Sequence, residues 1–326
     1  MAMLTDKYGR RIDYLRLSVT DRCDLRCTYC MPSSFDGYEC RQDWLSFDEL
    51  QRLCRIFVSL GVSRIRLTGG EPLVRARFPE LVAGIGQIPG LEDLSLSTNG
   101  TRLKQHAQAL RDAGVSRLNV SLDTLSRSDF AAITGRDVLP DVLDGLSFAS
   151  TLGFRLIKIN MVWMPERNGE QLDAMIEFCR ERGFVLRLIE NMPVGDTARQ
   201  LGSSSLQPLI AQLRDKHQLV DHVIPGAGPA RYLASADRRF SIGFITPMSQ
   251  HFCETCNRVR ISSTGALHLC LGQENRVELL PLLRDATMAD RDIADRIFQA
   301  IQQKPFKHDF LEAPEKIVRF MSSTGG

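Results

Sequence analysis

The stretch YLRLSVTDRCDLRCTYC, residues 14–30, joins a short apolar run to three closely spaced cysteines. Residues 14–19 have the composition of a buried β-strand. Cys23, Cys27 and Cys30 follow with the spacing C-x3-C-x2-C, and three is a poor number for disulfide pairs or for a structural zinc site, which needs four ligands. Three thiolates can instead hold a cubane iron–sulfur cluster and leave one iron open to a small molecule.

Five further strand-like runs follow this stretch, at residues 63–68, 92–98, 116–122, 154–162 and 184–190. Helix-like segments separate them, and such short crossovers predict parallel strands and an α/β fold. One helix is predicted to begin with a capping box of Ser46 and Glu49 and to end at Gly61. Another runs from Asn168, as its N-cap, to Gly183, and a third from about 287 to 302.

Polar or glycine-rich sequence follows the carboxyl end of most predicted strands. After the first come the cysteines, after the second GGEP (69–72), after the third TNG (98–100), and after the sixth ENMPVG (190–195), while SLD (121–123) ends the fourth. In parallel α/β barrels these ends form the active-site face. Asp123, Glu71 and Glu190 lie at this predicted face, and the sequence reveals no acid–base pair among them.

The alternation of predicted strands and helices stops after about residue 200. The segment PGAGPA (225–230) is a strong turn signal. We therefore predict two regions, residues 5–225 and residues 226–326. The second region contains another cysteine triad, Cys253, Cys256 and Cys270, with the spacing C-x2-C-x13-C. Zinc with His251 or His268 as fourth ligand remains an alternative for this triad, whereas no histidine lies near the first one.

The remaining cysteines have simpler interpretations. Cys54 and Cys179 lie in helical segments among apolar neighbours and are expected to be buried, and Cys40 in a loop receives no role.

Composition excludes several classes of protein. The chain has 326 residues, 43% of them apolar and 25% charged, and a net charge of +2. This gives no global field for binding nucleic acid or an anionic membrane. No signal peptide is visible, and no apolar run approaches the roughly 18 residues of a membrane span. A cytoplasmic location is expected, where the nine cysteines are more suited to metal or redox work than to disulfides.

The first triad after strand one and GGEP after strand two resemble the radical S-adenosylmethionine (SAM) superfamily. The second triad, NRVR (257–260), KPFKHDF (304–310) and the terminal Gly325–Gly326 are similar to the GTP 3′,8-cyclase family within it. The resemblance implies a partial (βα)6 TIM-like barrel of the radical SAM type, with a C-terminal extension that binds a cluster. It also implies two [4Fe–4S] clusters and SAM as cofactors, and cyclisation of GTP through hydrogen removal from the ribose C3′ and attack on guanine C8.

The resemblance assigns individual residues by their place in the motifs. The SAM contacts it implies are Tyr29, Gly70, Ser121 and Met192. The GTP contacts it implies are Arg16, Arg66, Thr98, Lys158, Arg258, Val259 and Arg260. Arg187 is a plausible further cation for the triphosphate, because burying several negative charges needs fixed donors. The tail residues Gly325 and Gly326 are expected to reach into the active site and support a step after hydrogen removal.

Other functions and partners remain to be weighed. A different radical SAM enzyme, such as a peptide-modifying one, would be expected to carry more cysteines in its C-terminal region. A nucleic-acid-binding iron–sulfur or zinc regulator is disfavoured by the near-neutral charge and the absence of a recognition-helix motif. Beyond GTP, the resemblance implies a reductant or electron-transfer protein and a downstream cyclic pyranopterin monophosphate synthase as partners. A monomer or a homodimer is expected.

Overall fold

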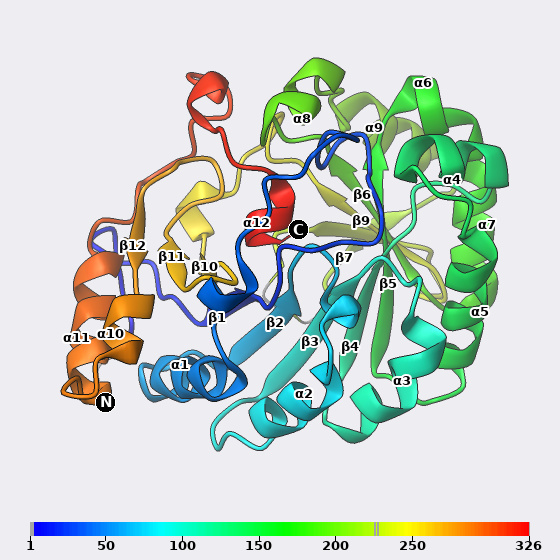
Figure 1. The fold of residues 1–326 in the computed structure, drawn as a ribbon. Coiled ribbons are helices and arrows are strands. Elements are labelled where there is room, and N and C mark those ends of the chain that lie inside the picture. The colour runs from blue at the N-terminus through cyan, green and yellow to red at the C-terminus, as the bar shows by residue number, and fades with distance from the viewer. Residues whose placement is uncertain (1–2, 225, 227, 326) are drawn as a thin grey trace.

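The computed structural model describes residues 3–224, 226 and 228–325, and its centre is a curved parallel sheet (Figure 1). All six predicted strands are confirmed to within two residues at their ends. They are β1 (Tyr14–Ser18), β2 (Arg64–Thr68), β3 (Asp93–Thr98), β4 (Arg117–Ser121), β5 (Leu156–Trp163) and β6 (Val185–Glu190). Each pairs in parallel with the next along the chain, as the short helical crossovers predict.

The C-terminal region extends this same sheet at both of its edges. β9 (Ser241–Ile245) adds in parallel to β6, and β10 (Arg258–Ile261) adds in parallel to β1. Four shorter strands pair antiparallel outside these two: β7 (Val220–His222), β8 (Arg231–Ala234), β11 (Ala266–His268) and β12 (Arg276–Glu278). The sheet order is therefore β12-β11-β10-β1-β2-β3-β4-β5-β6-β9-β8-β7.

Most helices cover the outer face of the curved sheet, whereas the short C-terminal helix lies on its inner side (Figure 1). Their bounds are α1 (Phe47–Ser59), α2 (Phe78–Gly86), α3 (Leu103–Asp112), α4 (Arg127–Thr134), α5 (Leu139–Ser150), α6 (Pro165–Asn168), α7 (Leu172–Arg182), α8 (Asp196–Leu201), α9 (Gln207–Lys216), α10 (Leu280–Arg284), α11 (Asp290–Ile301) and α12 (Met321–Thr324).

The predicted helix ends are partly confirmed. Ser46 and Glu49 form the capping box of α1, and Gly61 follows the C-cap residue with a φ of +93°. The prediction that Asn168 caps α7 is wrong. Its buried side chain instead accepts a hydrogen bond from the Met164 amide at 3.0 Å and donates to the carbonyl oxygen of Asp123 at 3.1 Å. Asn168 thereby links the loops after β4 and β5, and α7 begins later, at Leu172.

Successive residues of the inner strands face opposite sides of the sheet, one toward the helices and the next toward the barrel interior. Leu15 and Leu17 of β1 belong to the apolar core beneath the helices. Arg16, which lies between them, lines a cavity inside the barrel. This alternation follows from the period of two in a β-strand and directs charged side chains into the barrel interior. Cys54 and Cys179 lie in the apolar core, as predicted. Within the described residues, no helix is long and apolar enough to cross a membrane.

Candidate active site

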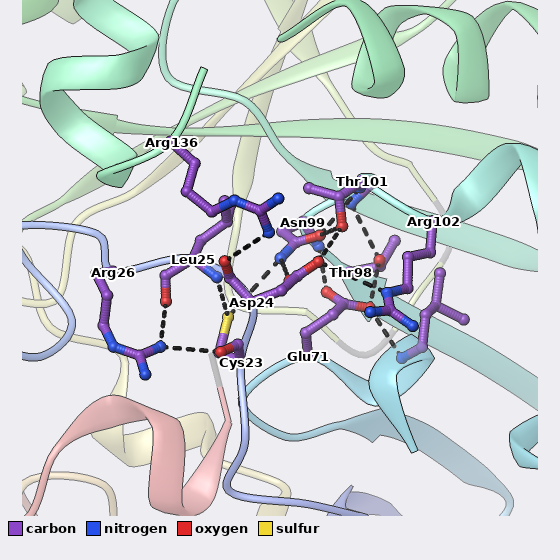
Figure 2. Close-up of polar contacts among 12 residues, drawn as sticks. Cys23, Asp24, Leu25, Arg26, Glu71, Thr98, Asn99, Thr101, Arg102 and Arg136 are labelled. Atoms are coloured by element: carbon purple, nitrogen blue, oxygen red, sulfur yellow. Dashed lines mark hydrogen bonds and ion pairs between the residues drawn. The ribbon is translucent and has the colours of Figure 1, made fainter. Parts of the chain in front are cut away.

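The first cysteine loop, residues 22–30, begins just beyond the carboxyl end of β1 (Figure 2). A hydrogen bond from the Cys30 amide to the Cys27 carbonyl oxygen, 2.9 Å long, closes a turn that contains two of the three cysteines. The Thr28 amide donates to the carbonyl oxygen of Ile133 at 2.9 Å and so attaches the loop to the end of α4. These contacts hold the cysteines in one small segment of backbone.

The three thiols of this loop have surroundings that suit sulfur ligands of a metal cluster. The Cys23 sulfur accepts hydrogen bonds from the Leu25 amide at 3.4 Å and from Asn99 Nδ2 at 3.7 Å. The backbone N–H of Ser322, in the C-terminal tail, hydrogen-bonds to the Cys30 sulfur, although burial still raises the pKa of that thiol to about 11. Burial also raises the pKa values of the other two thiols, so the free thiols are protonated and any metal that they bind would have to displace their protons.

Asp24 attaches the first cysteine loop to the TNG loop after β3 (Figure 2). One carboxylate oxygen accepts from Asn99 Nδ2 at 2.7 Å and the other from the Thr101 hydroxyl at 2.7 Å. Arg102 stands 3.7 Å from the same carboxylate. Because Asn99 also reaches the Cys23 sulfur, this network orients the first cysteine through two elements distant in sequence.

The GGEP segment after β2 supports the loop by close backbone approach. A Cβ atom on Gly70 would lie 2.3 Å from the Arg22 carbonyl oxygen, and one on Gly69 would lie 2.4 Å from that of Thr20. Only glycine fits such contacts. The Gly70 amide donates to Thr20 at 2.8 Å and the Glu71 amide to Arg22 at 2.7 Å. Gly70, predicted to contact SAM, therefore lies directly beneath the start of the cysteine loop.

Glu71 is fully buried and joins three neighbouring segments. Its carboxylate accepts hydrogen bonds from the Leu73 amide at 3.0 Å, the Thr98 hydroxyl at 2.7 Å and the Asn99 amide at 2.6 Å. Burial nevertheless raises the pKa of Glu71 to about 7. The hydroxyl of Thr98, a predicted GTP contact, is thus bonded to Glu71, and Thr98 is not among the residues that line the cavity.

Tyr29 and Asp123 form a pair where the cysteine loop meets the barrel interior. The Tyr29 hydroxyl donates to Asp123 at 2.8 Å, and the other oxygen of Asp123 accepts from the Val162 amide at 2.8 Å. Burial raises the pKa of Asp123 to about 6. Tyr29, Ser121 and Met192, three of the four predicted SAM contacts, line the cavity inside the barrel.

We call this cavity the cationic chamber, because five arginines line it: Arg16, Arg66, Arg187, Arg258 and Arg260. Three of them form a row across neighbouring strands, since Arg16 of β1 is paired in register with Arg260 of β10 and with Arg66 of β2. The Nε atoms of Arg16 and Arg66 are buried and have no hydrogen-bond partner among the described residues. Burial and the charge of Arg260 hold the pKa of Arg16 well below its ordinary value. Such a row is costly unless an anion fills the chamber.

Arg187 and one further predicted cation, Lys158, lie on the opposite side of the barrel from this row. Arg187 is oriented by its hydrogen bonds to Asn160 Oδ1 at 2.8 Å and Asn119 Oδ1 at 2.7 Å. Lys158 donates to the Tyr232 hydroxyl at 2.9 Å and is not among the chamber-lining residues. Burial, followed by the charge of Arg187, lowers the pKa of Lys158 to about 6. The free chain therefore holds this lysine mostly uncharged at neutral pH.

The second triad lies at the other end of the chamber. Cys253, Cys256 and Cys270 all line it, together with Val259. Cys256 precedes β10, which runs parallel to β1, and Cys270 follows the antiparallel β11, so this triad lies at the amino ends of the parallel strands. The first triad follows the carboxyl end of β1. The two triads therefore flank the chamber from opposite ends.

Sequence reasoning missed three cations that support the second triad. Arg10 donates to the Cys253 carbonyl oxygen at 2.8 Å, Arg319 to that of Cys270 at 3.2 Å, and Lys304 to that of Arg258 at 3.0 Å. Burial tends to raise the pKa of Cys256, but the charges of Lys304 and Arg258 outweigh it and lower that pKa to about 7. Only Lys304 carried a sequence signal, because it lies in the KPFKHDF motif.

The zinc alternative for the second triad finds little support in the geometry. His268 lines the chamber, whereas His251 is exposed and lies against the ring of His308. In the part of the chain that the structure describes, no three Cys, His, Asp or Glu side chains converge as ligands of one ion. Thiolates of a cubane cluster each bind a different iron, so they do not need to converge in this way.

The C-terminal tail, with α12, lies on the inner side of the curved sheet (Figure 1). The Gly325 carbonyl oxygen accepts a hydrogen bond from Arg260 Nη1 at 2.6 Å, and Ser322 contacts the Cys30 sulfur, as described above. Gly325 has a φ of +72°, and a Cβ atom there would lie 2.2 Å from Thr68 Cγ2. The tail thus requires glycine at this position, and the predicted Gly326 lies outside the described residues.

Two family models together match most of the chain. The Radical SAM superfamily model matches residues 17–179, and the Molybdenum Cofactor Synthesis C model matches residues 184–310. GTP 3′,8-cyclase 1 of Pseudomonas aeruginosa is 44% identical over 325 residues, which cover 98% of each chain. The GTP 3′,8-cyclase of Erythrobacter litoralis is 45% identical over 332 residues, covering 99% of this chain and 98% of the relative.

Solved structures show a likeness in fold. The crystal structure of Streptococcus suis SuiB bound to the precursor peptide SuiA superimposes with a TM-score of 0.60. The match covers 86% of this chain and 67% of SuiB at 14% identity, so it supports the barrel architecture alone.

Proposed function

The chain belongs to the radical SAM superfamily and, within it, to the GTP 3′,8-cyclase family, and from this membership we propose how its chamber serves the reaction. The reaction is cyclisation of GTP to (8S)-3′,8-cyclo-7,8-dihydroguanosine 5′-triphosphate, the first step of molybdenum cofactor biosynthesis. The observation that carries the proposal is the row of buried arginines between two cysteine triads. A triphosphate is the kind of anion that such a row requires.

Superfamily membership implies SAM and one [4Fe–4S] cluster, which we assign to Cys23, Cys27 and Cys30. When bound, this pair supplies the radical that begins the cyclisation. The donor set fits the cluster, since three half-buried thiols occupy one loop and two of them accept N–H hydrogen bonds. Tyr29, Gly70, Ser121 and Met192 are the residues proposed to hold SAM.

We assign a second [4Fe–4S] cluster to Cys253, Cys256 and Cys270. Three thiols facing a chamber rich in cations suit an anionic cluster, and the lowered pKa of Cys256 indicates an environment that stabilises thiolate. Cys253, Cys256 and Cys270 would hold this cluster beside the guanine base, to which it would supply a metal contact. The chain's own part is to hold the two ligand segments through Arg10, Arg319 and Lys304.

The chain's remaining residues position and enclose GTP. Five arginines neutralise the triphosphate: Arg16, Arg66, Arg187, Arg258 and Arg260. Val259 packs beside the triphosphate. Lys158 becomes charged when the phosphates approach. Thr98 acts through Glu71, to which its hydroxyl is bonded. Gly325 and Gly326 bring the tail against the reacting groups, and the bond of Gly325 to Arg260 supports this placement. Water is excluded because these side chains are buried in the barrel.

Several finer proposals accompany the reaction. We place the boundary between the barrel and the C-terminal region near residue 225. The free state of all the cysteines in the described residues supports work in the reducing cytoplasm. An electron-transfer protein would supply the reductant, and a cyclic pyranopterin monophosphate synthase would consume the product. The chain is proposed to act as a monomer or homodimer.

The test is anaerobic incubation of the iron-loaded chain with SAM, GTP and dithionite, followed by mass analysis. The proposal expects 5′-deoxyadenosine and a cyclised nucleotide triphosphate, and about eight irons per chain. Abundant 5′-deoxyadenosine with unaltered GTP would show that another substrate belongs in the chamber. Zinc in place of iron would overturn both cluster assignments.

A further inference from the structure

A second pocket opens on the outer surface beside the first cysteine loop. We call it the outer basic pocket; its charged lining residues are Arg22, Arg41, Arg75, Arg77, Arg102 and Asp24. Five of these are cationic and one is anionic, whereas the whole chain has a net charge of only +2. Asp24 is already bonded to Asn99 and Thr101, so its charge is partly satisfied within the protein. Arg102, Arg22 and Arg77 face Asp24, Asp21 and Glu80, respectively, so the excess of positive charge in the pocket is carried by Arg41 and Arg75.

Cys23 also lines the outer basic pocket, and this position sets the pocket apart from the chamber. None of the three first-triad cysteines is among the residues that line the chamber. Cys23 is thus the member of the first triad that faces an opening on the outer surface. Its sulfur receives the Asn99 hydrogen bond shown in Figure 2, and Arg102 lies beside the same network. A group bound in the pocket would lie next to a ligand of the first cluster.

The wall of the outer basic pocket is fixed by aromatic and backbone contacts. The Arg75 guanidinium lies over the rings of Phe47 at 4.8 Å and Trp44 at 5.5 Å, and both rings line the pocket. Arg75 also donates to the Leu45 carbonyl oxygen at 2.6 Å. By contrast, the side chains of Arg41 and Arg77 are exposed at the rim. The pocket combines a rigid apolar and cationic wall with exposed cations around it, which is typical of a protein-binding surface.

We propose that the outer basic pocket is the docking site of a protein one-electron carrier with an acidic face. This inference rests on the proposed function, because that reaction needs an electron delivered to the first cluster from outside the chain. The inner side of the cysteine loop meets the chamber and the tail, where Ser322 contacts Cys30, so the carrier must approach from the outer side. In the docked complex the reduced carrier loses one electron and the cluster gains it, with no bond formed or broken.

The test compares two double variants that change the net charge equally. Arg41→Glu with Arg77→Glu reverses two exposed cations at the pocket rim. Arg180→Glu with Arg296→Glu is the matched control, because Arg77 and Arg180 each pair with a glutamate three residues away and Arg41 and Arg296 are simply exposed. Cluster reduction is followed by anaerobic stopped-flow absorbance, using a reduced flavodoxin as the acidic carrier and dithionite as a small reductant.

We expect the rim variant to slow flavodoxin-driven reduction by about tenfold at low salt, since electrostatic steering changes association rates by this order. The wild-type rate should fall with rising salt, and the rim variant should show a weaker salt dependence. Dithionite reduction and the control variant should keep wild-type rates. Equal rates for the rim and control variants, or a rim variant that is equally slow with dithionite, would overturn the docking site. If the proposed function itself is wrong, a different result is expected: the wild-type chain will not cleave SAM with dithionite.

Discussion

Lys158→Met is the substitution that best separates a buried, neutral lysine from an ordinary charged one. In the free chain, burial and nearby cations lower the pKa of Lys158 to about 6. An approaching triphosphate reverses the sign of the local field and raises this pKa toward its ordinary value. GTP binding should therefore take up a proton near neutral pH, and methionine, which does not titrate, should abolish that uptake.

The magnitude follows from the pKa. With a value of about 6, only about a tenth of Lys158 is protonated at pH 7, so full protonation on binding takes up about 0.9 proton per GTP. At pH 6 the same group should take up only about half a proton. Charging it costs roughly 1 kcal/mol at pH 7 and about twice that at pH 8, against roughly 1.5–3 kcal/mol for a charge-assisted hydrogen bond. Lys158→Met should therefore weaken GTP binding by up to about tenfold at pH 7 and by much less at pH 8.

The assay is isothermal titration of the anaerobic, iron-loaded chain with GTP in two buffers of different ionisation enthalpy. The difference between wild type and Lys158→Met removes the contribution of the ionisation of GTP itself. Lys216→Met, at an exposed lysine paired with Asp173, is the matched control and should behave as wild type. Equal proton uptake by wild type and Lys158→Met would show that Lys158 does not gain a proton when GTP binds. A loss of GTP affinity in Lys158→Met that grows from pH 7 to pH 8 would show the same.

Four other substitutions test separate parts of the site. Gly325→Val should leave iron content and GTP binding intact but reduce product yield at least about tenfold, because a Cβ atom would collide with Thr68 at a positive φ; full yield would show that the tail position is unimportant. Cys27→Ala should abolish SAM cleavage, whereas Cys270→Ala should keep uncoupled 5′-deoxyadenosine formation without GTP turnover; equal loss in both, with the first cluster intact in Cys270→Ala, would contradict separate roles. Arg16→Ala should weaken GTP binding by about 10- to 100-fold with little change for guanosine, since the lost contact is charge-assisted; equal weakening of both ligands in equilibrium dialysis would exclude a phosphate contact.

The sequence predicted the inner barrel well because its signals are local. Alternating β-branched runs, short crossovers and the Ser46–Glu49 capping box each depend on a few neighbouring residues. The sequence did not reveal that β9 and β10 extend the sheet at opposite edges, because that pairing joins residues more than 50 and 200 positions apart. Asn168 was misread for the same reason, since its hydrogen bonds to Met164 and Asp123 are set by tertiary structure.

In the candidate site, too, residues in short motifs could be predicted from the sequence, whereas residues placed by tertiary structure could not. The cysteine triads and Gly325 were found from short motifs, and the structure brings Arg16, Arg66 and Arg260 into one row through strand register. Strand register is invisible in a single sequence. Arg10 and Arg319 were missed because they support the second triad through backbone carbonyl oxygens, which leave no motif.

We propose above that the cationic chamber presents the ribose of GTP to the radical chemistry at the first triad. The most direct measurement uses GTP carrying deuterium at C3′, incubated anaerobically with SAM and dithionite, followed by mass analysis of the 5′-deoxyadenosine formed. We expect one deuterium in 5′-deoxyadenosine, and the amount of this labelled product should rise together with the amount of cyclised nucleotide. Unlabelled 5′-deoxyadenosine formed alongside the cyclised nucleotide would contradict this proposal.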